Sequence, residues 1–292
     1  RVSPRMHFFA TCMVFTGSVF SSVWIVIANS WQQTPAGHHI VGEGAARRAE
    51  IVDFWAMVHN PSAIPRLAHV LLGAFILGGF FVASVSAYHV LRGIEAEASK
   101  RALTLALAFA FASNVAMGLS GHEQANVVAE HQPAKLAAFE GHFRTSNEGV
   151  PLYLFGVPDV DAGRVRYGVG IPGMLSVLVK GDPNAPLPAL DSVPPEDRPP
   201  VPVPFTAYHV MITLAGAMTG LSALALFFRA RGTLFEKRWL LRALVPAVVM
   251  PYVANQAGWV AAEVGRQPWV VYGLLRTKDA ASKVVHTEQI AI

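Results

Sequence analysis

The tract at residues 258–269, GWVAAEVGRQPW, places a carboxylate and a guanidinium near the end of a long apolar segment. Trp259, Glu263 and Arg266 are four and three residues apart, so on a helix they share one face. Ionisable side chains at membrane depth are costly and usually carry function. The same spacing fits a structural ion pair that ties a helix end to its neighbours. From spacing alone the two interpretations weigh equally.

A histidine and a methionine lie at matched depth in two other apolar segments. His69 lies about two turns into segment 63–91, and Met211 lies about two turns into segment 204–228. At a rise of ~1.5 Å per residue, each sits ~10 Å below the same membrane surface. Imidazole and thioether form a known axial pair for a low-spin haem. The matched depth therefore favours a haem site between two helices.

Small residues follow both candidate ligands by one helical turn. Gly73 comes four residues after His69, and Ala215 comes four after Met211, which would leave room for a flat macrocycle. The alternatives are ordinary ones. Methionine is a common gap filler in helix cores, and an intramembrane histidine more often bonds a neighbouring helix than a metal. His209 is a rival partner for His69, but it is two residues from Met211 and faces elsewhere.

Three further ionisable residues could complete a redox chain. Glu263 shares the depth of His69 and Met211, where a carboxylate can ligate a high-spin iron or pass protons. Lys135 and Glu140, in KLAAFE, begin a long connection and could hydrogen-bond and deprotonate a quinol, whose oxidation sheds two protons. A solvated charged helix is the simpler interpretation of the Lys135–Glu140 spacing, and spacing alone favours it.

The elements that must position these residues are membrane helices. The chain has 292 residues, 53% of them hydrophobic and only 14% charged, whereas soluble domains carry about 25% charge. A span needs about 20 apolar residues, and five blocks meet that criterion: 8–31, 63–91, 102–120, 204–228 and 239–263. We therefore expect an all-α, polytopic transmembrane helical bundle. The single cysteine, Cys12, excludes a disulfide within the chain and a thiolate metal site.

The distribution of basic residues predicts the orientation. Lysine and arginine gather in the connections 92–101 and 229–242, which the positive-inside rule places in the cytoplasm. Their position at helix ends argues against a nucleic-acid partner. The predicted layout is 1–120, three spans with a short periplasmic connection; 121–203, a long extracytoplasmic loop; 204–264, two further spans; and 265–292, a periplasmic tail.

Four motifs occur in an order that matches a known family. They are WIVIANSW at 24–31, KLAAFE at 135–140, LFGVPD at 154–159 and GRQPW at 265–269. The chain resembles subunit I of the cytochrome bd-type quinol oxidases, including the cyanide-insensitive branch. The resemblance covers nearly the whole chain, and it makes segment 121–203 the quinol-binding loop.

The resemblance implies a role for each candidate residue. His69 and Met211 match the axial ligands of the low-spin haem b, and Glu263 matches the carboxylate at the high-spin haem b. Residues of the haem environment are matched by Trp259 and Arg266.

The quinol-site pair is matched by Lys135 and Glu140. Two polar positions of the family's fourth helix, which belong to a possible proton path, are matched by Ser21 and Asn29.

The implied function is that of a terminal quinol:oxygen oxidoreductase in the bacterial cytoplasmic membrane. Quinol is oxidised on the periplasmic side, electrons pass through b haems, and oxygen is reduced to water with cytoplasmic protons, which generates a proton motive force without pumping. The implied partners are a second subunit and a small accessory subunit, and the oxygen site holds haem d or a further haem b. Ubiquinol and menaquinol are both open. The alternatives are a dihaem b electron-transfer anchor and a haem-free transporter or scaffold.

The chain also departs from the family pattern. Subunit I has nine membrane helices, and this chain resembles helices four to eight, so we expect an N- and C-terminally truncated fragment that is inactive alone. The tail at 265–292 would lead to the last helix. His209 stands where other members often have arginine, which bears on the tuning of the low-spin haem.

Overall fold

The computed structural model describes residues 2–43 and 48–280, so residues 281–292 of the predicted tail lie outside the described residues. The chain divides into two compact units, which are described separately. The first contains residues 1–68 and 266–292, and the second contains residues 69–265.

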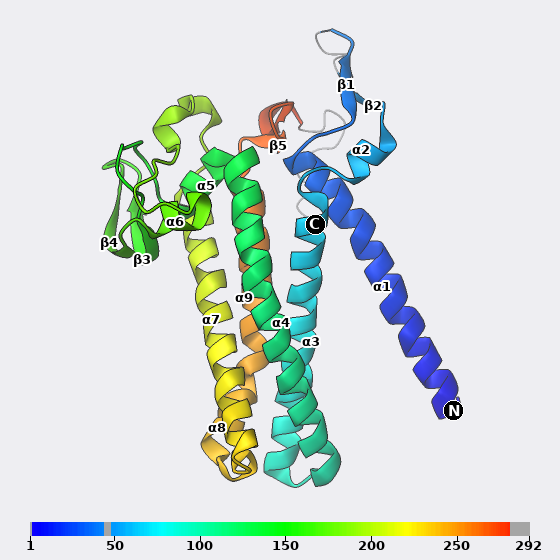
Figure 1. The fold of residues 1–292 in the computed structure, drawn as a ribbon. Helices are drawn as coiled ribbons and strands as arrows, with labels where there is room; N and C mark the ends of the chain where they lie inside the picture. The colour runs from blue at the N-terminus through cyan, green and yellow to red at the C-terminus, as the bar shows by residue number, and fades with distance from the viewer. Residues whose placement is uncertain (1, 44–47, 281–292) are drawn as a thin grey trace, which may run out of the picture. The chain divides into compact units, whose positions relative to one another are not determined.

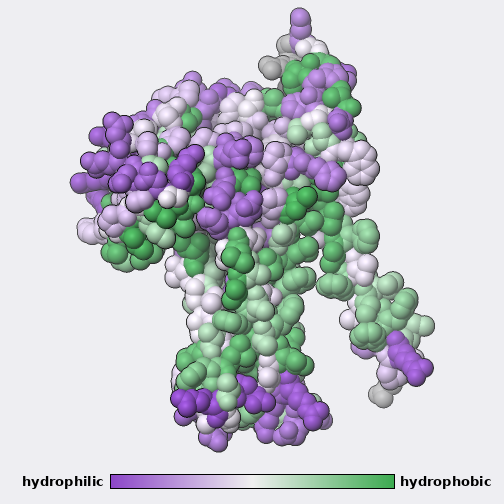
Figure 2. Space-filling view, in the orientation of Figure 1, coloured by the Kyte–Doolittle hydropathy of each residue, from purple (hydrophilic) through white to green (hydrophobic). Residues whose placement is uncertain are grey.

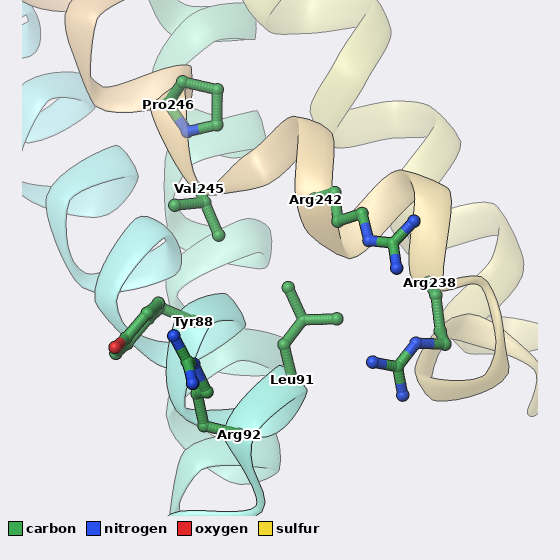
Figure 3. Close-up of a pocket in the computed structure, with 7 residues that line it drawn as sticks. All are labelled: Tyr88, Leu91, Arg92, Arg238, Arg242, Val245 and Pro246. Atoms are coloured by element: carbon green, nitrogen blue, oxygen red, sulfur yellow. The ribbon is translucent and has the colours of Figure 1, made fainter.

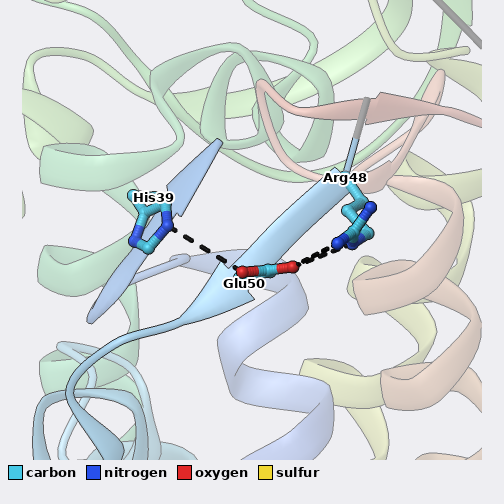
Figure 4. A network of polar contacts seen from close by, with 3 residues as sticks. All are labelled: His39, Arg48 and Glu50. Atoms are coloured by element: carbon cyan, nitrogen blue, oxygen red, sulfur yellow. Dashed lines mark hydrogen bonds and ion pairs between the residues drawn. The ribbon is translucent and has the colours of Figure 1, made fainter. Parts of the chain in front are cut away.

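The first unit is built on one long helix, α1 (Pro4–Gln33), whose N-terminus is capped by the Ser3 side chain. A hairpin of β1 (His38–Val41) and β2 (Arg48–Ile51) follows, and then α2 (Phe54–Val58). In the hairpin, the Glu50 carboxylate accepts a hydrogen bond of 2.9 Å from Arg48 Nε and lies 4.0 Å from His39 Nε2 (Figure 4). Near the C-terminus, β5 (Trp269–Val271) pairs with β6 (Leu275–Arg276), and η6 (Thr277–Asp279) follows. The ion pairs of Glu50 with Arg48 and His39 in the first hairpin are exposed, so they contribute little to stability.

The second unit is a helical bundle (Figure 1). Its long helices are α3 (Ala63–Arg92, which begins in the first unit), α4 (Ala96–His131), α7 (Pro202–Ala230) and α9 (Val249–Val264). A buried apolar cluster joins all four: Ile76 and Phe80 from α3, Ala110 from α4, Met218 from α7 and Ala254 from α9. Figure 2 shows a band of apolar surface on these helices, with hydrophilic residues gathered at their ends.

Four of the predicted spans are long, continuous apolar helices. Within the described residues, α1, α3, α4 and α7 are long and apolar enough to cross a membrane. The fifth predicted span, over 239–263, is helical but is not one continuous helix. That segment consists of α8 (Arg238–Leu244), a 3-10 turn η5 (Pro246–Val248) and α9. Proline has no N–H to continue the helix, so the chain breaks at Pro246, and the Ser84 hydroxyl donates to the carbonyl of Val245.

The segment between α4 and α7 folds around its own small core. It contains α5 (Pro133–Glu140), the antiparallel hairpin β3 (Leu152–Asp159) and β4 (Arg164–Ile171), α6 (Met174–Lys180), and the short turns η2 (Leu190–Ser192) and η3 (Pro195–Asp197). Outside this segment, the turn η4 (Leu234–Glu236) connects α7 and α8. Ala137 and Ala138 of α5 pack with Leu190 and with Phe205 of α7. Helix α5 is thereby fixed on the end of the bundle where α7 begins.

Candidate functional site

Helix α5 presents two charged residues to the protein interior. It begins at Pro133, whose missing N–H is not needed at a helix start, and it ends at Gly141, which adopts φ 62°. Lys135 is 3% exposed and Glu140 is 1% exposed. The interpretation of this segment as a solvated charged helix is therefore wrong. Burying charged side chains costs free energy, so proteins usually keep such residues for a function.

Lys135 lies against the end of α9. Its Nζ is 3.3 Å from Gln132 Oε1, to which it donates, and 5.9 Å from the centre of the Phe139 ring. A Cβ atom at Gly265 would lie 2.7 Å from Phe139 Cε1 and 3.2 Å from Lys135 Cγ. Glycine at position 265 is therefore what allows α5 to approach α9 so closely.

Glu140 has the most perturbed carboxyl group outside the membrane helices in the described part of the chain. Burial raises its pKa from 4.5 to about 8, and the nearby Tyr208 hydroxyl opposes the rise only in part. Among the described residues, neither carboxylate oxygen meets a partner with normal hydrogen-bond geometry. A carboxyl group whose pKa lies close to neutrality can both accept and release a proton.

Helix α5 packs directly against α7. The Phe139 and Tyr208 rings stack with their centres 5.1 Å apart at an interplanar angle of 13°. Tyr208 precedes Met211 by three residues in α7, which is less than one helical turn. The structure thus packs Phe139, which lies between Lys135 and Glu140 on α5, against a residue within one turn of the candidate methionine ligand.

The packing of the bundle fixes the level of His69 and Met211. Ile76 and Met218 meet in one apolar cluster, and Ala83 and Ala225 meet in the next cluster along the same two helices, so α3 and α7 run in the same direction. His69 comes seven residues before Ile76, and Met211 comes seven before Met218. Seven residues are nearly two full helical turns. His69 therefore lies on the same face of α3 as Ile76, and Met211 lies on the same face of α7 as Met218. Both lie at one level along the bundle.

The surroundings of the two residues test whether a haem fits. His69 Nδ1 is 3.2 Å from the Ser120 hydroxyl of α4, a hydrogen bond of the kind that orients an imidazole ligand. A Cβ at Gly121 would lie 3.9 Å from His69 Cε1, and one at Gly258 would lie 2.8 Å from Met211 Sδ. Both candidate ligands are thus bordered by glycine, and this donor set fits a low-spin haem.

The room expected beside Gly73 is filled by a side chain of α9. The Asn255 side chain of α9 fills the space at Gly73, donating to the Gly73 carbonyl at 3.3 Å. Ala215 packs on the apolar cluster of the bundle. The prediction of open space at Gly73 is wrong, because α9 approaches α3 there more closely than sequence spacing can show. The same expectation for Ala215 stays a prediction.

The residues of the first motif divide between the two units. Trp259 and Glu263 lie on α9, both half-buried, with the four-residue spacing that places them on one helix face. Arg266 belongs to the first unit, where its Nη1 donates to Gln32 Oε1 at 3.0 Å and to the Val270 carbonyl at 2.6 Å.

Two polar positions of α1 have different surroundings. Asn29 accepts a hydrogen bond from Arg66 within the first unit. Ser21 lies on the exposed surface of α1. Asn29 thus belongs to a polar cluster of its unit, whereas Ser21 faces outward from its helix.

His209 is the buried polar residue whose contacts the sequence did not predict. Its Nδ1 lies 2.8 Å from the Phe205 carbonyl and its Nε2 lies 3.0 Å from the Tyr153 carbonyl of β3, while its ring stacks on Phe205 at 4.0 Å. This contact ties the loop hairpin to α7. The two carbonyls engage both ring nitrogens, so His209 does not act as the rival partner of His69. No local signal in the sequence pairs His209 with Tyr153.

Comparison with known proteins gives one consistent result. The family model for cytochrome bd terminal oxidase subunit I matches residues 1–292. The chain is 32% identical over 97% of its length to the cytochrome bd ubiquinol oxidase subunit 1 of Bacillus subtilis (strain 168), covering 61% of that protein. It is 33% identical over 97% of its length to the putative cytochrome bd menaquinol oxidase subunit I of the same organism, covering 63% of it.

A solved structure shares the fold. The bd oxidase from Geobacillus thermodenitrificans matches with a TM-score of 0.85 and 31% identity, over 100% of this chain and 66% of that chain. The chain thus spans a little under two thirds of the length of these relatives. The helices and the relatives together indicate a helical bacterial membrane protein. The chain belongs to the cytochrome bd terminal oxidase subunit I family.

Proposed function

We propose that this protein is the quinol-oxidising subunit I of a terminal quinol:oxygen oxidoreductase in a bacterial inner membrane, which it crosses several times. One observation carries the proposal: Lys135 and Glu140 are buried on α5, and Phe139 of the same helix stacks on Tyr208, which precedes Met211 by three residues in α7. A site that takes protons from quinol and a site that takes electrons from it must be adjacent. Membership of the cytochrome bd terminal oxidase subunit I family supports the same function.

The Lys135–Glu140 corner has the groups that quinol oxidation needs. The reaction releases two protons and two electrons from the two hydroxyl groups of quinol. We assign to Lys135 the binding of a quinol oxygen through its ammonium group. To Glu140, with a pKa of about 8, we assign the acceptance of one proton as a carboxylate and its later release to the outer water.

The proposed haem ligands belong to the helices below this corner. Cytochromes carry haem, and haem b supplies one-electron transfer when it is bound. His69 and Met211 would hold the low-spin haem b through its iron, and Glu263 would serve the high-spin haem b. Trp259 and Arg266 would complete the haem surroundings, with the Arg266 guanidinium suited to propionate groups.

The remaining assignments rest on the family rather than on a contact. We propose haem d or a further haem b at the oxygen site, a second subunit II and a small accessory subunit as partners, and Asn29 and Ser21 as members of a proton path. The arginine-rich connections face the cytoplasm by the positive-inside rule, so the quinol corner faces outward. Protons released outside and consumed inside then generate a proton motive force without a pump.

The quinol assignment is tested by anaerobic rapid mixing of the assembled oxidase with a soluble quinol. Reduction of the low-spin haem is followed by absorbance. In the Glu140→Gln variant we expect reduction by quinol to slow, while reduction by dithionite, which needs no quinol site, keeps its normal rate and extent.

Glu148, an exposed carboxylate in the same loop, provides the matched control. The Glu148→Gln variant should reduce with quinol at the normal rate. The assignment of the quinol site fails if Glu140→Gln and Glu148→Gln behave alike, or if the Glu140 variant slows equally with both reductants.

A further inference from the structure

The inner end of the bundle carries a basic hollow that the proposed redox chemistry does not use. The hollow has a volume of ≈ 540 Å³ and lies between the end of α3 and the α8–η5 segment (Figure 3). Three arginines line it, Arg92 from α3 and Arg238 and Arg242 from α8, together with the apolar Leu91 and Val245. Figure 3 shows Arg238 and Arg242 on one side of the hollow and Arg92 on the other.

The three arginines hold their positive charge without a carboxylate. No acidic residue lines the hollow, and within residues 2–43 and 48–280 none of the three is ion-paired. Arg92 lies over the Tyr88 ring, 5.5 Å from its centre, which holds its guanidinium beside the hollow. Arg238 and Arg242 are four residues apart in α8, so they share one face. Three arginines that line one hollow suit a phosphate.

A second hollow lies along the same helix, α3, nearer the middle of the bundle. It has a volume of ≈ 590 Å³ and lies between α3 and η5–α9, lined by Gly78 and Phe81 on one side and Val248, Val249 and Tyr252 on the other. No charged residue lines it. From Tyr88 in the basic hollow to Gly78 in the apolar one, α3 rises ~15 Å, which is about half of a bilayer's ~30 Å hydrocarbon core.

We propose that the α3–α8–α9 groove, defined as these two hollows together, binds one anionic glycerophospholipid. Its phosphate group would pair with Arg92, Arg238 and Arg242, and one acyl chain would lie along Gly78 and Phe81. The order of charge and apolar surface matches the two ends of such a lipid, and basic pockets between helices on the cytoplasmic side are known to take anionic lipid headgroups.

The test measures lipid retention by the purified protein. The protein is delipidated in mild detergent, and phosphatidylglycerol or phosphatidylcholine is added back and counted by native mass spectrometry. We expect one tightly held phosphatidylglycerol per chain and much weaker retention of phosphatidylcholine. Equal retention of the two lipids would overturn the proposal.

Charge variants separate the groove from general surface charge. The triple variant Arg92→Gln/Arg238→Gln/Arg242→Gln should retain phosphatidylglycerol roughly a hundredfold more weakly. The matched triple variant Arg101→Gln/Arg229→Gln/Arg231→Gln removes the same charge from exposed positions at the same end of the bundle and should retain the lipid normally. Similar losses in both triples would refute a specific site.

A steric variant separates a lipid from a free anion. A Cβ atom at Gly78 or at Gly220 would meet nothing within 4 Å, so Gly78→Phe places a ring in the apolar hollow and Gly220→Phe places one at an open position of α7. The Gly78 variant should lose the lipid and the Gly220 variant should keep it. If Gly78→Phe folds poorly, Ala74→Leu in the same groove replaces it.

Three outcomes contradict a bound lipid. Phosphatidylglycerol retention that Gly78→Phe leaves unchanged would mean that only the headgroup is bound and that no acyl chain lies in the apolar hollow. Full displacement of phosphatidylglycerol by inorganic phosphate would show the same. A co-purifying polypeptide that is lost from the groove variants, in place of lipid, would make the groove a protein interface.

Discussion

The two ends of the second unit treat charge in opposite ways. At the outer end, Lys135 and Glu140 are buried against α7 and α9, whereas at the inner end Arg92, Arg238 and Arg242 are exposed around a hollow. Burying a charge is far more costly than leaving it in water. The buried pair therefore indicates proton chemistry, and the exposed cluster indicates attraction of an anion.

The largest expected effect comes from the buried carboxylate. Replacing Glu140 by Gln keeps the shape of the side chain but removes the proton acceptor, so quinol oxidation should fall by about 10²- to 10³-fold. The measurement is quinol-dependent oxygen uptake by the assembled oxidase. The triple arginine variant of the inner groove should stay within about twofold of normal under saturating lipid. Equal losses at the two ends would remove the distinction between them.

The pH dependence of quinol oxidation follows from the same group. Below its pKa of about 8 the Glu140 carboxyl is mostly protonated and cannot accept a proton, and above it the carboxylate form prevails. The rate should therefore rise with pH up to about 8 and then level off. The Glu140→Gln variant should lose this rise. A rate that falls over the same pH range in the unmodified protein would contradict the assignment.

A smaller effect is expected where α9 touches the candidate methionine ligand. A Cβ at Gly258 would lie 2.8 Å from Met211 Sδ, so Gly258→Leu should displace the thioether and destabilise the site by about 1–3 kcal/mol. The measurement is the haem content of the purified protein and the midpoint potential of its low-spin haem. Gly220→Leu, at an open position of α7, is the control and should change neither. Identical behaviour of the two variants would show that Gly258 does not border the ligand.

The smallest effect is expected at Tyr208. Its hydroxyl lowers the pKa of Glu140, so Tyr208→Phe should move the rise in the pH profile to higher pH. At neutral pH, a higher pKa leaves less of the Glu140 carboxyl ionised, so quinol oxidation should slow by roughly two- to tenfold. A shift of the profile to lower pH would refute the proposed contact. The pH–rate profile of oxygen uptake checks both points.

Sequence patterns predicted the membrane helices well because hydrophobic length is a local property. The exception is the segment at 239–263, where Pro246 breaks the helix although the apolar run continues. Proline is visible in the sequence, but whether a helix bends or stops there depends on a partner such as Ser84, which donates to Val245 from a different helix.

The depth of His69 and Met211 was also predictable, since depth follows from counting residues along a helix. Burial of Lys135 and Glu140 was not, because α5 is covered by residues far away in the sequence, such as Phe205 and Gly265. The same limit explains the wrong prediction at Gly73, where Asn255 fills the space from α9. Long-range packing decides these cases, and spacing within one segment does not reveal it.

The central claim is that Met211 ligates the iron of the low-spin haem. The most direct test is the reduced-minus-oxidised absorbance spectrum of the Met211→Leu variant, with Met218→Leu, two turns further along the same face of α7, as the control. We predict that Met211→Leu loses the low-spin b haem signal and that Met218→Leu keeps it. A normal low-spin spectrum in the Met211→Leu variant would contradict the claim.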